Sequence, residues 1–118
     1  MVWTVKYLKP IITKDIEETL RQYINEVAEE KGFTIITFTV ISKNAICCLI
    51  NAPPKLSVSY IVKMLKGISG RKLLFHYPGI KKELHNSELW NHSYLAKTVG
   101  SIPEEEIQQY IEKQVKSY

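Results

Sequence analysis

The sequence is poor in the residues that cross-link chains or bind metals. Among its 118 residues are two cysteines and three histidines. Cys47 and Cys48 are adjacent in a strand-like segment, so their side chains point to opposite faces and make a poor disulfide pair. This pattern fits a reducing compartment such as the cytoplasm. His76, His85 and His92 show no two-residue spacing, and a single loop histidine is more often exposed to solvent than bound to a metal.

Long hydrophobic runs are also missing. No apolar segment approaches the roughly 18 residues of a membrane span, and the N-terminus has no signal-peptide pattern. Neither an internal repeat nor a low-complexity segment is present. At 118 residues and 45% hydrophobic content, the chain suits one compact domain, residues 1–118, with its own core. We expect a soluble, cytoplasmic protein without a membrane partner.

The formal net charge is +4, a moderate basic excess that favours a polyanionic partner. Acidic residues gather on one side of the helix predicted over Thr13 to Gly32, which is therefore a poor surface for phosphates. The densest basic patch without interrupting acids comprises Lys63, Lys66, Arg71 and Lys72. We predict nucleic-acid contacts at this patch, and at Lys6 as an outlier, although an ordinary solvated helix face fits the charge nearly as well.

Hydrophobic periodicity predicts an α+β fold. Alternation favours strands over Val2–Tyr7, Phe33–Ile41 and Tyr94–Val99, and the apolar run Ala45–Ile50 suits the middle of a sheet. In the second strand, the alternation places Ile36, Phe38 and Val40 on one face. Helical stripes follow Thr13 and Ser57, each of which can cap a helix, and Lys31-Gly32 closes the first of these helices. The order predicts a ferredoxin-like (RRM-like) four-stranded antiparallel sheet with helices on one face and an added C-terminal helix. Residues 76–92 combine loop signals with helix-compatible residues and allow no firmer prediction.

The last predicted helix, Ser101–Val115, presents two polar groups one turn apart. Ser101 and Glu104 form a capping-box pattern, and Pro103 suits a first turn. Tyr110 and Gln114 are four residues apart, so their side chains leave one strip of the helix, beside the apolar stripe of Ile107, Ile111 and Val115. On this helix alone, a packed tyrosine with a hydrated hydroxyl and an ordinary surface glutamine would be the better interpretation.

Several ordered segments together resemble a known family over nearly the whole chain. They are Val2-Trp3-Thr4-Val5-Lys6-Tyr7, Ala52-Pro53-Pro54-Lys55-Leu56-Ser57-Val58-Ser59, Leu65-Lys66-Gly67-Ile68-Ser69-Gly70-Arg71-Lys72-Leu73, Leu89-Trp90, Ser93-Tyr94-Leu95, Thr98-Val99-Gly100 and Tyr110-Ile111-Glu112-Lys113-Gln114. The chain resembles the single-tyrosine transposases of the HUH (histidine, hydrophobic, histidine) class, which move insertion sequences as single-stranded DNA.

This resemblance implies a homodimer that binds DNA hairpins at the ends of the element. It implies that a tyrosine, matched by Tyr110, attacks the scissile phosphate and leaves a 5′-phosphotyrosine and a free 3′-hydroxyl. A phenol has an unperturbed pKa of about 10, so its attack needs assistance at neutral pH. In the family, a divalent metal such as Mg²⁺ or Mn²⁺ assists, held by two histidines of a central strand and by a glutamine that Gln114 matches.

The two histidines are missing. Their expected positions fall on Ala45, which has no ligand atom, and on Cys47, whose soft sulfur suits Mg²⁺ poorly. Two interpretations remain open. In the first, this member of the family has lost its metal site, by decay or by adoption of another role, and has kept the fold. In the second, a softer metal such as Zn²⁺ or Mn²⁺ is bound by Cys47, Gln114 and a distant side chain. The simplest alternative is that Cys47 is a small, buried apolar residue of the strand.

Three functions follow. The first is a transposase with weakened or lost metal-dependent cleavage, and the second is an inactive DNA-binding relic or regulator of an intact relative. A domesticated member acting on chromosomal hairpins is a variant of the first. The third is an RNA-binding module, which the lack of stacking aromatics in Ala45–Ile50 disfavours.

Overall fold

A three-stranded antiparallel sheet forms the centre of the computed structural model, which describes residues 1–84, 88–97 and 102–116. The strands are β1 (Val2–Thr4), β2 (Thr34–Ile41) and β3 (Ala45–Asn51), in the order β1-β3-β2. The helices are the 3₁₀ turn η1 (Lys6–Leu8), α1 (Lys14–Lys31), α2 (Val58–His76), α3 (Pro78–Glu83) and α4 (Glu104–Lys116). The fold is therefore α+β, as predicted, but the four-stranded ferredoxin-like sheet is not confirmed.

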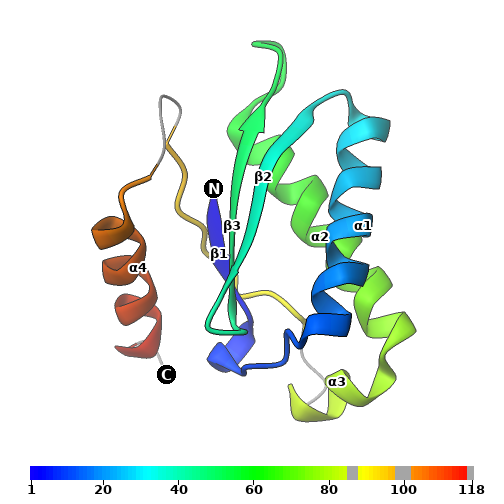
Figure 1. Cartoon of the computed structure of the whole chain (residues 1–118), viewed down its shortest axis with the longest axis vertical. Coiled ribbons are helices and arrows are strands. Elements are labelled where there is room, and N and C mark those ends of the chain that lie inside the picture. Colours follow the sequence, from blue (N-terminus) through cyan, green and yellow to red (C-terminus); the bar gives the residue numbers. More distant parts are fainter. Residues whose placement is uncertain (85–87, 98–101, 117–118) are drawn as a thin grey trace.

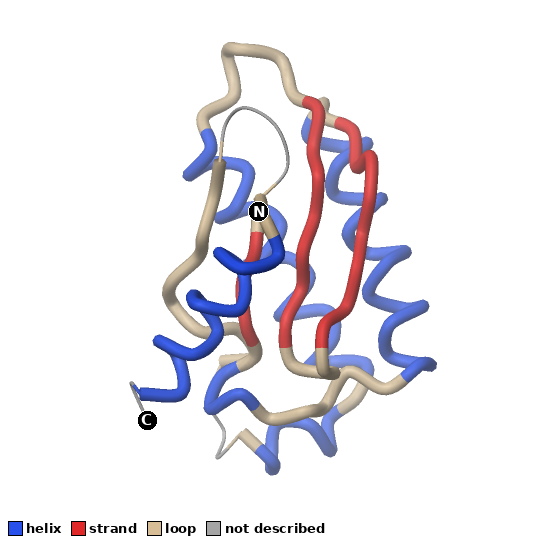
Figure 2. The backbone as a smooth tube through the Cα atoms, turned by 60° about the vertical axis from the view of Figure 1, so that its left-hand side comes forward, coloured by secondary structure: helices blue, strands red, loops and turns tan. Residues whose placement is uncertain are grey.

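The sheet has helices on both faces, in unequal numbers. Helices α1 and α2 lie side by side on one face, and α4 lies on the other side, next to β1 (Figures 1 and 2). The main core fills the space between the sheet and the α1–α2 layer, where Trp3, Ile46 and Cys48 are buried. Because side chains alternate along a strand, their neighbours Val2, Thr4, Ala45 and Cys47 face α4.

Local sequence signals act where they were predicted. Gly32 ends α1 in the left-handed region, with a φ of 86°. The Ser57 hydroxyl accepts a hydrogen bond of 3.1 Å from the backbone N–H of Tyr60 and thereby caps α2. The turn between β2 and β3 has positive φ angles at Ser42 and Lys43, which close the predicted hairpin.

Two predicted strands differ from the observed ones. The prediction of Val2–Tyr7 was too long, because Tyr7 has a φ of 59° and belongs to η1. In β2, the register shifts between Ile35 and Thr37, so the strand carries a bulge at this point. The bulge leaves Ile36 55% exposed while Phe38 is buried, so these two residues do not share the predicted inner face.

Residues 90–95, which include only the start of the predicted fourth strand Tyr94–Val99, meet the sheet at isolated bridges. Leu95 bridges Val2 and Trp90 bridges Val5, both antiparallel, on the free edge of β1. Four residues, 91–94, separate the two bridges on this segment, whereas only Trp3 and Thr4 separate them on the opposite side. The two extra residues prevent a continuous ladder, so the backbone bulges. Thr98 and Val99 lie outside the described residues. The bulge covers residues 91–94 and lies next to α4.

Helix α4 buries a different stripe from the one predicted. Ile107 and Gln114 are both 8% exposed, whereas Val115 is 58% exposed. The predicted Ser101 cap lies outside the described residues. Within the described ranges, no helix is long and apolar enough to cross a membrane.

Candidate functional site

Tyr110 and Gln114 of α4 contact one short segment beside β1. The Tyr110 hydroxyl lies 2.6 Å from the hydroxyl of Ser93. Ser93 Oγ donates a hydrogen bond of 3.2 Å to Gln114 Oε1, and Asn91 Nδ2 donates a second hydrogen bond to the same oxygen. The two residues that sequence spacing placed on one strip of the helix therefore belong to one polar network.

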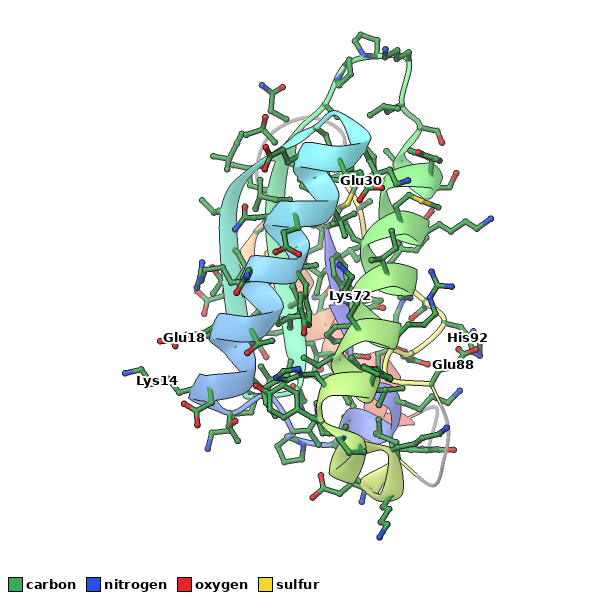
Figure 3. All side chains as sticks on the ribbon, turned by 90° about the vertical axis from the view of Figure 1, so that its right-hand side faces the viewer. Lys14, Glu18, Glu30, Lys72, Glu88 and His92 are labelled. Carbon is green, nitrogen blue, oxygen red and sulfur yellow. The ribbon has the colours of Figure 1, made fainter. Side chains whose placement is uncertain are left out.

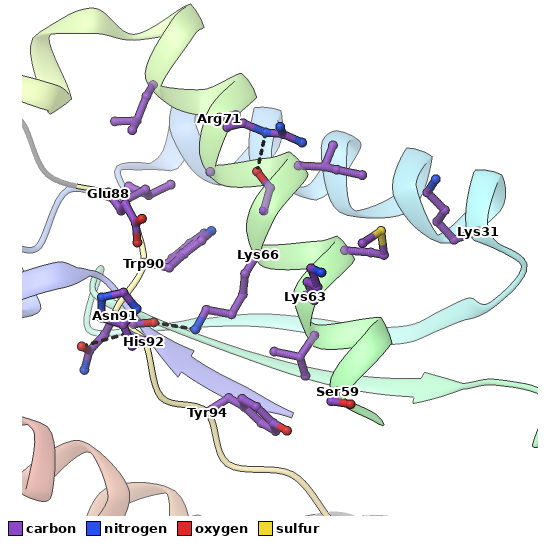
Figure 4. Close-up of a pocket in the computed structure, with 17 residues that line it drawn as sticks. Lys31, Ser59, Lys63, Lys66, Arg71, Glu88, Trp90, Asn91, His92 and Tyr94 are labelled. Carbon is purple, nitrogen blue, oxygen red and sulfur yellow. Dashed lines mark hydrogen bonds between the residues drawn. The ribbon is translucent and has the colours of Figure 1, made fainter. Parts of the chain in front are cut away.

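Lys66 holds this segment from the side opposite α4. Its ammonium donates to the backbone carbonyl of Asn91 at 2.5 Å (Figure 4) and to that of Ser93 at 3.1 Å. No backbone N–H of the described residues donates to these two carbonyls, and Lys66 supplies the donors. Burial lowers the pKa of Lys66 to about 8, an effect that the nearby Glu88 carboxylate partly opposes.

Ala45 and Cys47 lie on the face of β3 that α4 covers. Ala45 pairs with Thr4 and Cys47 pairs with Val2 across the β1–β3 ladder. Ala45 is fully buried and Cys47 is half-buried. The two positions thus share one face, as their spacing predicted.

These residues do not fit the divalent metal that the family resemblance implies. Ala45 has no ligand atom, and the amide oxygen of Gln114 already accepts hydrogen bonds from Asn91 and Ser93. In the described part of the chain, no group of three or more histidine, cysteine, aspartate or glutamate side chains gathers at one point. The role of Cys47 as a soft-metal ligand stays a prediction.

A basic groove of about 770 Å³ lies between α2 and the segment around residues 88–94. Figure 4 shows Lys66 reaching across it from α2 towards Asn91. Its charged walls are Lys31, Lys63, Lys66 and Arg71, with the carboxylate of Glu88 among them. His92 and Tyr94 add exposed aromatic surface, with Tyr94 39% exposed, whereas Trp90 lines the groove as a buried residue. Basic and aromatic groups together suit a single-stranded nucleic acid.

The five residues predicted to bind nucleic acid separate into two groups. Lys63, Lys66 and Arg71 line the groove. Lys72 instead lies against α1 (Figure 3), where it is 3.7 Å from the Glu26 carboxylate and 5.5 Å from the centre of the Tyr23 ring. Lys6 lies in η1, which contacts α4.

Sequence reasoning missed Asn91 and Ser93 as site residues. Both belong to the polar run Asn91-His92-Ser93 between the apolar pairs Leu89-Trp90 and Tyr94-Leu95. Such a polar interruption of a strand pattern was the available signal. Its connection to Tyr110 depends on contacts that are distant in sequence.

Comparisons with known proteins agree with this architecture. The family described as "Transposase IS200 like" matches residues 1–114. The ISDra2 transposase TnpA of Deinococcus radiodurans is 32% identical over 114 residues, covering 97% of this chain and 81% of the relative. The transposase for insertion sequence element IS200 of Salmonella typhimurium is 28% identical, covering 98% and 74%. A crystal structure of a protein described as a transposase, also from Deinococcus radiodurans, superposes with a TM-score of 0.87 at 29% identity, covering 96% and 86%.

Proposed function

Because the chain belongs to the IS200-like transposase family, we propose that it acts in DNA transposition by binding single-stranded DNA hairpins, with Tyr110 as its nucleophile. The observation that carries this proposal is the shared network of Tyr110, Gln114 and Ser93. If Tyr110 were merely packed against the sheet, there would be no need for Gln114, a buried polar residue of the same helix, to bind the same Ser93 hydroxyl as the phenol does. The arrangement instead holds the phenol in one orientation, as nucleophilic attack requires.

The reaction exchanges one phosphodiester bond for another. The Tyr110 oxygen bonds to phosphorus as its proton leaves to water, and the bond from phosphorus to the 3′-oxygen breaks. The departing oxygen takes a proton from water, which leaves a free 3′-hydroxyl and a 5′-phosphotyrosine. Joining to a new end reverses these steps, so no external energy source is needed.

Metal-dependent cleavage is weakened or lost in this proposal. A divalent metal would neutralise charge on the phosphate and the leaving group. Ala45, Cys47 and the occupied oxygen of Gln114 fit neither Mg²⁺ nor Mn²⁺. The alternative in which Cys47 binds a softer metal is tested by adding Zn²⁺ or Mn²⁺ to the cleavage assay.

The basic groove between α2 and residues 88–94 is the proposed DNA surface. Lys63 and Arg71 are exposed on α2 and offer their charges to phosphates. Phosphate contacts orient the nucleic acid without reading its sequence, and exposed bases can stack on Tyr94. Lys72 and Lys6 lie away from the groove, so they contribute at most to the long-range electrostatic potential that attracts DNA. The proposed assembly is a homodimer, as the family resemblance implies, in the cytoplasm, as the cysteine pattern suggests.

The second candidate is a DNA-binding relic that regulates an intact relative. The full burial of Ala45, where the family resemblance expects a ligand, favours it. Both candidates predict hairpin binding, and only the first predicts covalent chemistry.

A hairpin-cleavage assay separates the two candidates. The purified protein is incubated with labelled single-stranded hairpins of the flanking element ends, with Mg²⁺, Mn²⁺ or Zn²⁺, and run on native and denaturing gels. An adduct that disappears in Tyr110→Phe and persists in Tyr60→Phe, a change at another partly exposed tyrosine, supports the transposase. Hairpin binding without an adduct supports the relic. Equal binding of hairpins and unstructured strands contradicts both candidates.

A further inference from the structure

The orientation of the polar network can be assigned from its hydrogen bonds. The backbone N–H of His92 donates to Asn91 Oδ1 at 3.0 Å, which fixes the side-chain amide of Asn91 with its NH₂ group towards α4. Gln114 must therefore present its oxygen to Asn91. The network thus determines which end of each amide faces the other.

The number of protons on each group then relates the directions of the two remaining hydrogen bonds, Ser93 to Gln114 and Tyr110 to Ser93. Ser93 has one hydroxyl proton, and that proton lies on the bond to Gln114 Oε1. With that proton on the bond to Gln114, the phenol is the donor in the short contact between Tyr110 and Ser93, where either hydroxyl can donate by geometry alone. The resulting chain runs from the Tyr110 hydroxyl to Ser93 and on to the oxygen of Gln114.

We propose that Ser93 and Asn91 are positioning residues for Tyr110, and that Gln114 acts in this chain as their hydrogen-bond acceptor and not as a metal ligand. This inference rests on the proposed function of Tyr110. Ser93 holds the phenol directly, and Asn91 fixes the Gln114 amide that orients the hydroxyl of Ser93. Lys66 fixes the backbone of both residues by donating to their carbonyls. The same Lys66 lines the basic groove, so the network joins the proposed DNA surface to the nucleophile.

The test uses 3-fluorotyrosine incorporated at the seven tyrosines and ¹⁹F NMR of the whole chain. Tyr110→Phe identifies the Tyr110 resonance. In Ser93→Ala this resonance should move while those of the tyrosines outside the 91–94 segment stay in place, and Ser93→Thr, which keeps a hydroxyl, should restore its position. An unchanged Tyr110 resonance in Ser93→Ala would overturn the proposal, because the phenol would not be held by Ser93.

Paramagnetic Mn²⁺ tests the role of Gln114 in the same sample. A manganese ion on Gln114 would broaden the Tyr110 resonance selectively, since the two side chains share one network. We expect no selective broadening in the natural chain and strong broadening in the Ala45→His, Cys47→His double variant. Selective broadening in the natural chain that disappears in Gln114→Leu would overturn the proposal.

A double-mutant cycle gives a third measurement that does not depend on DNA. The urea midpoints of Ser93→Ala and Gln114→Leu should combine non-additively. Ser93→Ala combined with Gln109→Leu, a change at an exposed glutamine of α4, should be additive. Additive effects in both pairs would contradict the network. Hairpin binding is measured separately, so a failure of the proposed function and a failure of this inference remain distinguishable.

Discussion

Thr4 lies directly opposite Ala45 in the β1–β3 ladder, and its buried hydroxyl has no hydrogen-bond partner in the part of the chain that the structure describes. Paired side chains on one sheet face lie within contact distance, so a larger polar residue at position 45 would reach this hydroxyl. The small Ala45 therefore leaves an unsatisfied polar group on the face that carries the candidate site.

The first prediction follows from the cost of burying an unpaired hydroxyl. Thr4→Val keeps the shape and removes the polar atom, so the free energy of unfolding should rise by about 1 kcal/mol. Urea denaturation monitored by circular dichroism measures the change. Thr39→Val, at an exposed position of β2, is the control and should change stability by less than about 0.5 kcal/mol. Destabilisation by Thr4→Val would mean that the hydroxyl has a partner.

Two glycines of α2 should respond oppositely to alanine. A Cβ at Gly67 meets no atom within 4 Å, so Gly67→Ala should raise the free energy of unfolding by up to about 1 kcal/mol through helix propensity. A Cβ at Gly70 would lie 3.3 Å from Trp90 Cδ1. Trp90 cannot move freely, because it packs edge-on against Trp3 and donates a hydrogen bond of 3.1 Å to Ser69 Oγ.

Gly70→Ala should therefore lower the free energy of unfolding by about 1 kcal/mol, since overpacking costs about 1–3 kcal/mol and propensity offsets part of it. Urea denaturation gives both values, and tryptophan fluorescence reports the displacement of Trp90. Equal stabilisation by the two substitutions would show that Trp90 adjusts without cost.

The adjacent cysteines should differ in reactivity. Burial is the main reason that the pKa of Cys48 rises to about 12, although the N-terminal ammonium partly opposes the shift. Only the thiolate reacts, so at pH 8 Cys48 should react with a disulfide reagent on the order of a thousand-fold more slowly than an unperturbed thiol. The half-buried Cys47 should react faster. Rates in Cys47→Ser and Cys48→Ala separate the two thiols, and equal rates in the folded chain would contradict the burial of Cys48.

The sequence predicted those features whose causes are local. Ser57 caps α2, Gly32 ends α1, and the two cysteines point to opposite faces because strand geometry requires it. The strip shared by Tyr110 and Gln114 also follows from helix geometry alone. These features need no knowledge of the rest of the chain.

Features that depend on distant contacts were not predictable in the same way. The bulge at Ile36 and the bulge over residues 91–94 are set by pairing with β3 and β1, and alternation in one segment does not reveal an inserted residue. The partners of Gln114 are more than 20 residues away in sequence. The short α3 carries too few turns for a periodic signal.

The last prediction concerns the pH dependence of stability through Lys66. Its pKa falls from 10.5 to about 8 on folding, mainly through burial. Between these two pH values the unfolded chain binds more protons than the folded chain, so the free energy of unfolding should rise with pH. Below pH 8 both states carry the proton and this contribution is constant. Its size is smaller than the full shift would give, because the ammonium is only partly buried.

Lys66→Met isolates this contribution, since other lysines and tyrosines also titrate in the range. The stability difference between the natural chain and Lys66→Met should be flat from pH 6 to 8 and then grow in favour of the natural chain up to pH 10.5. Lys63→Met, at an exposed position of the same helix, should show no such slope. A difference that shrinks above pH 8 would mean that the charged ammonium is the favoured form on the carbonyls of Asn91 and Ser93, which would reverse the sign of the burial effect.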